Sequence, residues 1–260
     1  MNKATKAEAP EGAVFVAFLF QEEAHMAIAG YCTAFIDYWE QNARWYQLWV
    51  EHSNYHELIL HHLLKHIQPH WRVLDMGAGN GILSLPLAAI GCEVTAIEPS
   101  SAMRRLFFRQ AWRCGIGHVR VDERSWSQVS CFDYSGCDLI IACNSLHVCE
   151  EGMIDAFRRI LAMRPRNIFV VTEMGGDVLQ TCADSGGYAL CWSNEYEMLS
   201  PHVYHSLAEA FEYWRFASQT GARQLDEHAF ASRLRISQGH WYLDENVNVS
   251  LLWWKDSENG

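Results

Sequence analysis

The stretch VLDMGAGNG, residues 73–81, indicates the fold of this chain. A short apolar run leads into an acid, Asp75, and three alternating glycines follow. Glycines directly after a strand allow positive φ angles and let the backbone come close to a ligand. The helix that follows presents its N-terminus at the same place. The stretch therefore predicts a ligand-binding turn between a strand and a helix.

The spacing of the glycines distinguishes two kinds of ligand. A dinucleotide site has the pattern GxGxxG and holds a pyrophosphate at the turn. Here the glycines run GxGxG, and Ile82 stands where the third dinucleotide glycine would be. The carboxylate of Asp75 would repel a pyrophosphate but attract an ammonium group. The turn favours the cationic head of an amino acid, and it argues against a nicotinamide dehydrogenase.

A second acid stands at the end of the next predicted strand. Glu98 directly follows the run EVTAI, residues 93–97. An acid at that position can accept hydrogen bonds from both hydroxyls of a ribose. A ligand that carries an ammonium group and a ribose, but no phosphate, points to S-adenosylmethionine.

Strand and helix patterns alternate through the middle of the chain. The apolar run CDLIIAC has the composition of a strand buried on both faces. The alternation with short links predicts an α/β fold with a Rossmann-like, doubly wound, mostly parallel sheet. Strands are predicted at 71–75, 93–98, 118–121, 137–143 and 167–173, and helices at 82–90, 102–112 and 153–163.

Further elements are predicted on both sides of this core. Apolar stripes predict helices between 21 and 68, and the run at 13–20 indicates a buried element of an N-terminal cap. We expect one compact domain with a helical cap or lid at 1–70, a cofactor-binding core at 71–175 and a C-terminal cap insertion with the final strands at 176–260. In that last part, strands are predicted at 188–196 and 247–254, and helices near 205–218 and 225–235.

Charge and composition limit the partners. The 260-residue chain has a formal net charge of −11, which repels a polyanion and argues against nucleic acid. Six arginines between 104 and 124 are a local exception, which we interpret as a solvated helix face. No apolar run reaches the roughly 20 residues of a membrane helix, so we expect no membrane partner. Nine cysteines without paired spacing indicate reduced thiols and a cytoplasmic location.

Taken together, the motifs resemble those of the class I S-adenosylmethionine-dependent methyltransferases, in particular the type 11 group of mostly small-molecule enzymes. The resemblance covers residues 39–175. It rests on DMGAGNG (75–81), EPSSAM (98–103) and CDLIIACNSLH (137–147), which match the glycine motif, the loop after the second strand and the tip of the fourth. It implies the seven-stranded methyltransferase fold, with S-adenosyl-L-methionine as methyl donor and S-adenosyl-L-homocysteine as product.

The resemblance also implies contacts with the cofactor. Family members carry an acid in the turn after the third strand, whereas here Asp122 and Glu123 come earlier. The glycine turn would hold the methionine part of the cofactor through Asp75, Gly77, Ala78, Gly79, Asn80 and Gly81. The ribose would bind Glu98, and the adenine would lie near Pro99, Ser100, Met103, Ser125 and Trp126.

Three further residues receive roles near the methyl group. Asn144, at the tip of the fourth strand, would face the methyl group. The segment WEQNARWYQLW, residues 39–49, matches the family's N-terminal helix, and Tyr46 matches its lid tyrosine. The alternative for Tyr46 is packing within an aromatic stripe. His147 is, with Asn144, the candidate for catalysis. A base is needed only if the acceptor must lose a proton, and packing or loop hydrogen bonding is the alternative for His147.

The sequence indicates the acceptor only by class. NSLH stands in place of the tetrad of the family's DNA-amino and glutamine methylators, which argues against those substrates. Residues 176–246 contain many aromatic side chains. These could line a pocket for a flat small molecule, or they could pack the cap against the sheet. We expect a small-molecule acceptor, with an RNA or protein methyltransferase and a non-catalytic S-adenosylmethionine-binding partner subunit as alternatives. Histidine pairs at helical spacing are interpreted as a polar helix face, so no metal is expected, and the oligomeric state stays open.

Overall fold

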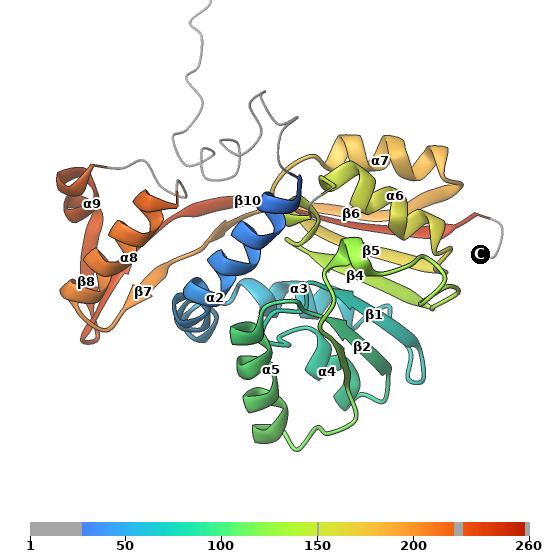
Figure 1. The fold of residues 1–260 in the computed structure, drawn as a ribbon, viewed down its shortest axis with the longest axis horizontal. Coiled ribbons are helices and arrows are strands. Elements are labelled where there is room, and N and C mark those ends of the chain that lie inside the picture. Colours follow the sequence, from blue (N-terminus) through green and yellow to red (C-terminus); the bar gives the residue numbers. More distant parts are fainter. Residues whose placement is uncertain (1–27, 150, 221–225, 258–260) are drawn as a thin grey trace, which may run out of the picture.

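A seven-stranded sheet runs through the molecule (Figure 1). The computed structural model describes residues 28–149, 151–220 and 226–257, and only the backbone of 28–35. The strand order is β3-β2-β1-β4-β5-β10-β6. The strands are β1 (Arg72–Met76), β2 (Glu93–Ile97), β3 (Arg120–Asp122), β4 (Leu139–Cys143), β5 (Asn167–Thr172), β6 (Tyr188–Leu199) and β10 (Asn246–Asp256).

The first five strands are mutually parallel, and β10 runs antiparallel between β5 and β6. This confirms the predicted doubly wound, mostly parallel sheet. The chain leaves β1 toward β2 and β3, and then returns to place β4 on the other side of β1. In open sheets of this kind, ligands bind at the carboxyl ends of the strands where the order reverses. The fold therefore directs attention to the ends of β1 and β4.

Helices cover both faces of the sheet because side chains alternate along each strand. On β1, for example, Val73 packs in the core beneath α3 and α4, whereas Leu74 packs in the core beneath α6 and α7. Helix α7 follows β5 and was not predicted from the sequence. The helices are α3 (Tyr55–Leu63), α4 (Ser84–Ala89), α5 (Ser101–Arg113), α6 (Met153–Ala162) and α7 (Gly176–Ser185).

A second lobe stands at one end of the sheet, and α2 (Ile28–His52) lies between it and the sheet (Figure 1). Its three-stranded sheet has the order β7-β9-β8 and was not predicted. Trp45 of α2 packs in the core of this lobe with Tyr213 and Phe216, at ring-centroid distances of 5.2 and 5.1 Å. The lobe consists of β7 (His202–Tyr204), α8 (Leu207–Gln219), α9 (Glu227–Arg233), β8 (Leu234–Ser237) and β9 (His240–Leu243).

Two predicted boundaries need comment. The predicted helix at 225–235 is too long, because Leu234 already begins β8 and pairs with Leu243 of β9. The segment 13–20, predicted as a buried cap element, lies outside the described residues. Across the ranges that the structure describes, no helix combines the length and the apolar character needed to cross a membrane.

Candidate functional site

The glycine turn after β1 is held close to two neighbouring elements. Gly77, Gly79 and Gly81 all have positive φ angles, of 70°, 59° and 82°. A Cβ on Gly77 would lie 2.6 Å from the Cβ of Ser145, and one on Gly81 would lie 2.7 Å from the ring of Phe107. Contacts this short exclude any side chain without a shift of the backbone. Gly77 therefore lets the turn approach the tip of β4, and Gly81 lets it approach α5.

Asp75 lies beneath this turn and is buried, with 2% of its surface exposed. Its Oδ2 accepts a hydrogen bond of 2.6 Å from the hydroxyl of Ser84, at the start of α4. Burial raises the pKa of the carboxyl to about 6, against the smaller opposing effect of the Ser84 bond. A buried carboxylate of this kind gains most from a positively charged ligand, since such a charge favours its ionised form.

Glu98 joins the turns after β1 and β2. Its Oε2 accepts a 2.8 Å hydrogen bond from the N–H of Gly79, and its Oε1 accepts one of 2.8 Å from the N–H of Ser100. Burial raises the pKa of Glu98 to about 7, although these two bonds act in the opposite direction. A carboxylate offers about four acceptor positions, so both oxygens can also accept from hydroxyl groups.

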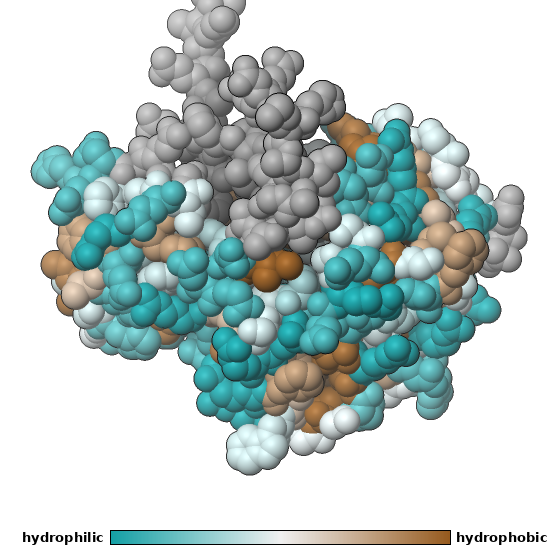
Figure 2. Space-filling view, in the orientation of Figure 1, coloured by the Kyte–Doolittle hydropathy of each residue, from teal (hydrophilic) through white to brown (hydrophobic). Residues whose placement is uncertain are grey.

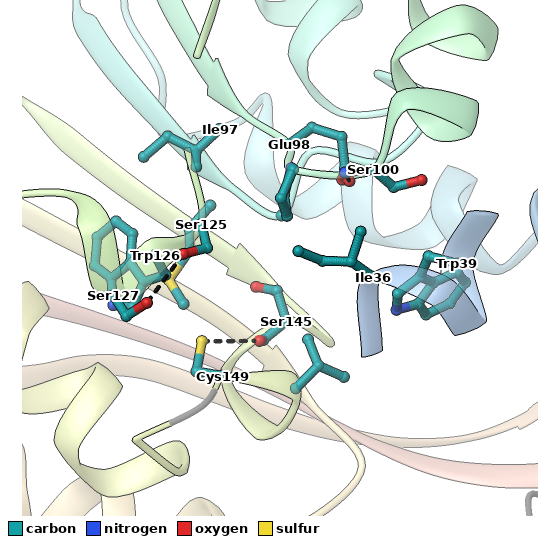
Figure 3. Close-up of a pocket in the computed structure, with 14 residues that line it drawn as sticks. Ile36, Trp39, Ile97, Glu98, Ser100, Ser125, Trp126, Ser127, Ser145 and Cys149 are labelled. Carbon is teal, nitrogen blue, oxygen red and sulfur yellow. Dashed lines mark hydrogen bonds between the residues drawn. The ribbon is translucent and has the colours of Figure 1, made fainter. Parts of the chain in front are cut away.

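A mostly apolar pocket opens beside Glu98 at the carboxyl ends of the strands (Figure 3). Helix α2 closes one side with Ile36 and Trp39, and the opposite side comes from η2 (Trp126–Gln128) and its neighbour Ser125. The chain after β4 contributes Ser145 and Cys149. Met76, Gly77 and residues 97–100 line the pocket toward the glycine turn, and Val148 lies between Ser145 and Cys149.

Helix α2 is tied to the site by polar contacts. Glu40 accepts hydrogen bonds from the hydroxyls of Ser100 and Ser101, both 3.0 Å. Burial raises the pKa of Glu40, but these bonds and those from the first turn of α5 outweigh it and leave the pKa lowered. Further along α2, Gln47 Oε1 accepts a 3.1 Å bond from Asn80 Nδ2 in the glycine turn. Neither Glu40 nor Gln47 was predicted, because each partner is far away in the sequence.

Tyr46 lies over the same turn. Its hydroxyl is 3.6 Å from the position that a Cβ on Gly79 would take, and its ring contacts Trp39 edge-on at 5.7 Å. Burial, followed by the nearby Cys143 and Glu98, raises the pKa of the phenol, so it stays protonated. A protonated hydroxyl at the mouth of the turn can donate a hydrogen bond to a ligand there.

The turn after β3 provides one wall of the pocket. Trp126 packs against α6, and its indole N–H donates to the carbonyl of Ala156 at 3.3 Å. The nearby acid, Asp122, accepts hydrogen bonds from Arg124 and Tyr134. The Arg124 guanidinium holds the pKa of Asp122 well below its usual range. This acid is engaged in an ion pair outside the pocket.

The tip of β4 carries two acceptor atoms without partners. Asn144 has a φ of 49°, and its Nδ2 donates to the hydroxyl of Tyr55 at 2.6 Å. Its Oδ1 is buried and has no hydrogen-bond partner among the described residues, and the same holds for Ser145 Oγ. His147, in η3 (Leu146–Val148), does not line the pocket, and burial lowers its pKa to about 4. Its imidazole is therefore neutral near pH 7.

Comparison with known proteins identifies this arrangement. A family model for a methyltransferase domain matches residues 73–166. The magnesium protoporphyrin IX methyltransferase of Synechocystis PCC 6803, solved with bound S-adenosylmethionine, shares 13% identity. That match covers 89% of this chain and 99% of the other, with a TM-score of 0.54. Residues 73–166 belong to the class I S-adenosylmethionine-dependent methyltransferases.

Two other similar proteins have no assigned activity. A functionally unknown protein from Deinococcus radiodurans R1 shares 13% identity, with 77% of this chain and 87% of that chain covered and a TM-score of 0.53. An uncharacterised protein of Haemophilus influenzae is 26% identical over 106 residues, which are 41% of this chain. The matched region spans only 38% of the length of that relative.

The residues of the methyltransferase domain fit its cofactor, S-adenosylmethionine. Two buried carboxyls, Asp75 and Glu98, have raised pKa values, and no lysine or arginine side chain among the described residues forms an ion pair with either. The cofactor would bring an ammonium, a sulfonium and ribose hydroxyls to them. The unpartnered oxygens of Asn144 and Ser145 lie at the same edge of the sheet. Among the described residues, no three His, Cys, Asp or Glu side chains form a metal site.

The predicted cofactor residues of the domain fall into three groups. One group surrounds the turn without lining the pocket: Asp75, Ala78, Gly79, Asn80, Gly81, Met103 and Tyr46. A second group, Asn144 with the predicted base His147, lies at the tip of β4. The third group lines the pocket: Gly77, Glu98, Pro99, Ser100, Ser125 and Trp126.

The aromatic residues of 176–246 do not line this pocket. Tyr204, Tyr213 and Trp241 pack within the second lobe around Trp45 of α2. Trp192 and Tyr196 pack against α3, where Tyr196 and His62 form a 2.7 Å hydrogen bond. The sequence left two interpretations of these aromatic residues, a substrate pocket or packing of the cap. The contacts observed here are packing contacts.

Proposed function

We propose that this chain transfers the methyl group of S-adenosylmethionine to a small-molecule acceptor. The observation that carries the proposal is the pocket at the carboxyl ends of the strands, which α2 covers from one side and to which Glu98 contributes a buried carboxyl. The cofactor supplies an activated methyl group. The protein must then align an acceptor with it and exclude water, and such positioning accounts for most of the rate.

The enclosure of the site supports a small acceptor. Helix α2 is fixed over the glycine turn by the bonds of Glu40 and Gln47. Aromatic rings of α2 and α3 also pack against one another. The ring centroid of Trp49 on α2 is 5.2 Å from that of Tyr55 and 5.2 Å from that of His56, both on α3. Walls built from a lid helix and packed rings suit a compact molecule better than a folded RNA or protein.

The arginines at 104–124 are the only feature of the sequence that supports a macromolecular acceptor. Arg104 donates to the carbonyls of Glu98 and Pro99 and pairs with Glu123. Arg124 pairs with Asp122 and Asp133 at 2.7 Å each. These two side chains stabilise local structure, and the net charge of −11 opposes binding of a polyanion.

The test uses S-adenosylmethionine labelled in its methyl group. The protein is incubated with it and a native cell extract, and the products are separated by size. We expect label in the small-molecule fraction, and much less of it with a Glu98→Ala variant at the same cofactor concentration. Label in RNA or protein would instead establish a macromolecular methyltransferase. Cofactor binding by calorimetry without any labelled product would support a non-catalytic binding subunit.

A further inference from the structure

The exposed phenylalanine and tryptophan side chains gather at one edge of the main sheet. In the described part of the chain there are three of them: Phe108 with 54% of its surface exposed, Trp112 with 83% and Phe132 with 85%. Phe108 and Trp112 are on α5, and Phe132 stands beside Asp133, which pairs with Arg124 just beyond β3. Figure 2 shows apolar surface in brown beside the position of α5, at the lower end of the view. Apolar side chains that gather on a surface in this way mark interaction sites.

The same face of α5 carries a row of arginines. Arg105, Arg109 and Arg113 are three or four residues from the two exposed aromatic residues of this helix, so all five share one side of it. Arg105 pairs with Glu40 at 3.8 Å. No acid among the described residues forms an ion pair with Arg109 or Arg113. Two positive charges on this face are therefore left for a partner.

A groove adjoins this face. It lies between α5 and β3, is lined by Arg104, Phe108 and residues 120–124, and has a volume of about 530 Å³. Strand β3 is at the edge of the seven-stranded sheet, so the groove opens at the side of the molecule. Arg120 of this groove is exposed, and it too has no ion pair with an acid in the ranges that the structure describes. A partner can seat side chains in the groove and reach three unpaired guanidinium groups around it.

The charge of this surface selects its partner. Residues 104–124 carry six arginines and only two acids, although the whole chain has a formal net charge of −11. Guanidinium groups form paired hydrogen bonds with carboxylates, so the surface favours an acidic partner. The net charge repels an extended polyanion such as RNA, whereas a short acidic segment meets mainly the local arginines, because more distant charges are screened. Phenylalanine, tryptophan and arginine are also enriched where proteins bind one another.

We propose that α5 and the groove beside β3 form a docking surface for an acidic segment of a partner protein. Apolar side chains of the segment pack against Phe108 and Trp112. Its carboxylates pair with Arg109, Arg113 and Arg120. Aromatic and arginine anchors of this kind carry most of the binding energy of protein interfaces. None of these five residues lines the pocket described above, so the inference goes beyond the proposed function and does not depend on it.

The experiment uses a fluorescein-labelled peptide, EELLEELLEELL, whose binding is measured by fluorescence anisotropy. A second peptide has lysine in place of each glutamate, and a third has serine in place of each leucine. The surface variants are Trp112→Ala and the double charge reversal Arg109→Glu with Arg113→Glu. Two matched controls lie elsewhere: Ile236→Ala changes an apolar side chain on β8 with 64% of its surface exposed, and Arg158→Glu reverses an exposed charge on α6.

We expect wild type and both controls to bind the acidic peptide with affinities within twofold of one another. Trp112→Ala should weaken this binding about 10-fold or more, and so should the change from leucine to serine in the peptide. The double charge reversal should abolish binding of the acidic peptide and create binding of the lysine peptide. Circular dichroism and the affinity for S-adenosylmethionine should stay unchanged in every variant, which separates loss of the surface from loss of the fold.

Two kinds of result would overturn this inference and leave the proposed methyl transfer standing. One is an acidic peptide that does not bind wild type, or that binds the two surface variants as tightly as wild type. The other is binding of single-stranded RNA, or of phosphatidylcholine vesicles with phosphatidylserine, that is tighter than that of the peptide and is lost in Trp112→Ala. The surface would then serve a nucleic acid or a membrane.

Discussion

The carboxylate of Glu40 on α2 accepts hydrogen bonds from the backbone N–H of Ala102 on α5, at 3.1 and 3.2 Å to its two oxygens. The N-terminus of a helix leaves N–H groups without intrahelical partners and carries a partial positive charge. An acid from another helix therefore caps α5 here. The same side chain therefore contributes to the cap of α5, with Ser100, and to the attachment of α2 beside the pocket, with Gln47.

Replacement of Glu40 by alanine should loosen α2 and weaken cofactor binding. Hydrogen bonds to a charged group contribute about 1.5–3 kcal/mol, so a loss of S-adenosylmethionine affinity of roughly 10-fold or more is expected. Calorimetry measures the affinity. Asp37→Ala, one turn earlier on α2 at an exposed position, serves as control and should bind normally. Equal affinities for the two variants would show that α2 is not a lid held by Glu40.

Removal of the Glu98 carboxyl should have a larger effect on the cofactor. Glu98→Ala removes the predicted acceptor of the ribose hydroxyls and leaves the N–H groups of Gly79 and Ser100 without their partner. We expect the affinity for S-adenosylmethionine to fall by more than 10-fold. Circular dichroism should still show the folded sheet, because the residue lies at the edge of the core. An affinity equal to that of wild type would show that Glu98 does not bind the cofactor.

The core of the fold could be predicted because its signals are local. The apolar runs predicted as strands form β1, β2, β4 and β5 of one mostly parallel sheet, and the glycine spacing marked the turn after β1. The three-stranded sheet was missed because β7, β8 and β9 are only three or four residues long. Strands that short show too little alternation to distinguish them from loops.

Parts of the site could not be predicted because they depend on distant pairs. Glu40 meets Ser100, and Tyr55 meets Asn144, across 60 and 89 residues of sequence. Nothing in the sequence near Glu40 distinguishes it from other polar helix residues, and nothing near Tyr55 distinguishes it from other aromatic residues of the core. The resemblance pointed to Tyr46 and Asn144, which the structure places near the turn and the β4 tip.

The packing at Gly81 gives a test of the turn itself. A Cβ there would lie 2.7 Å from the ring of Phe107, at a φ of 82°. Gly115 has a similar φ of 66° but nothing within 4 Å of the added atom. Gly115→Ala should lower the free energy of unfolding by about 1–2 kcal/mol, the cost of a left-handed alanine. Gly81→Ala should lower the free energy of unfolding by more, about 3 kcal/mol or above, because the clash with Phe107 adds to the backbone strain. Urea denaturation measures both, and equal losses would contradict the contact with Phe107.

The buried carboxyls make cofactor binding depend on pH. The pKa of Asp75 is raised to about 6 and that of Glu98 to about 7, in both cases by burial. A positively charged ligand favours the ionised forms and lowers both pKa values. Binding should therefore release protons, and the affinity for S-adenosylmethionine should rise as the pH increases through about 5.5–7.5. Calorimetry in buffers of different ionisation enthalpy counts the released protons.

The sign of the effect can be checked without ligand. In the unfolded chain these carboxyls ionise near their ordinary values, about 4, so between that pH and about 7 the unfolded state has bound fewer protons than the folded state. Their contribution therefore lowers the free energy of unfolding as the pH rises through this window. In Glu98→Gln the side chain no longer titrates, so its pH-dependent loss of stability should be smaller than that of wild type, and fewer protons should be released on binding. Identical proton release in the two proteins would show that Glu98 does not respond to the cofactor.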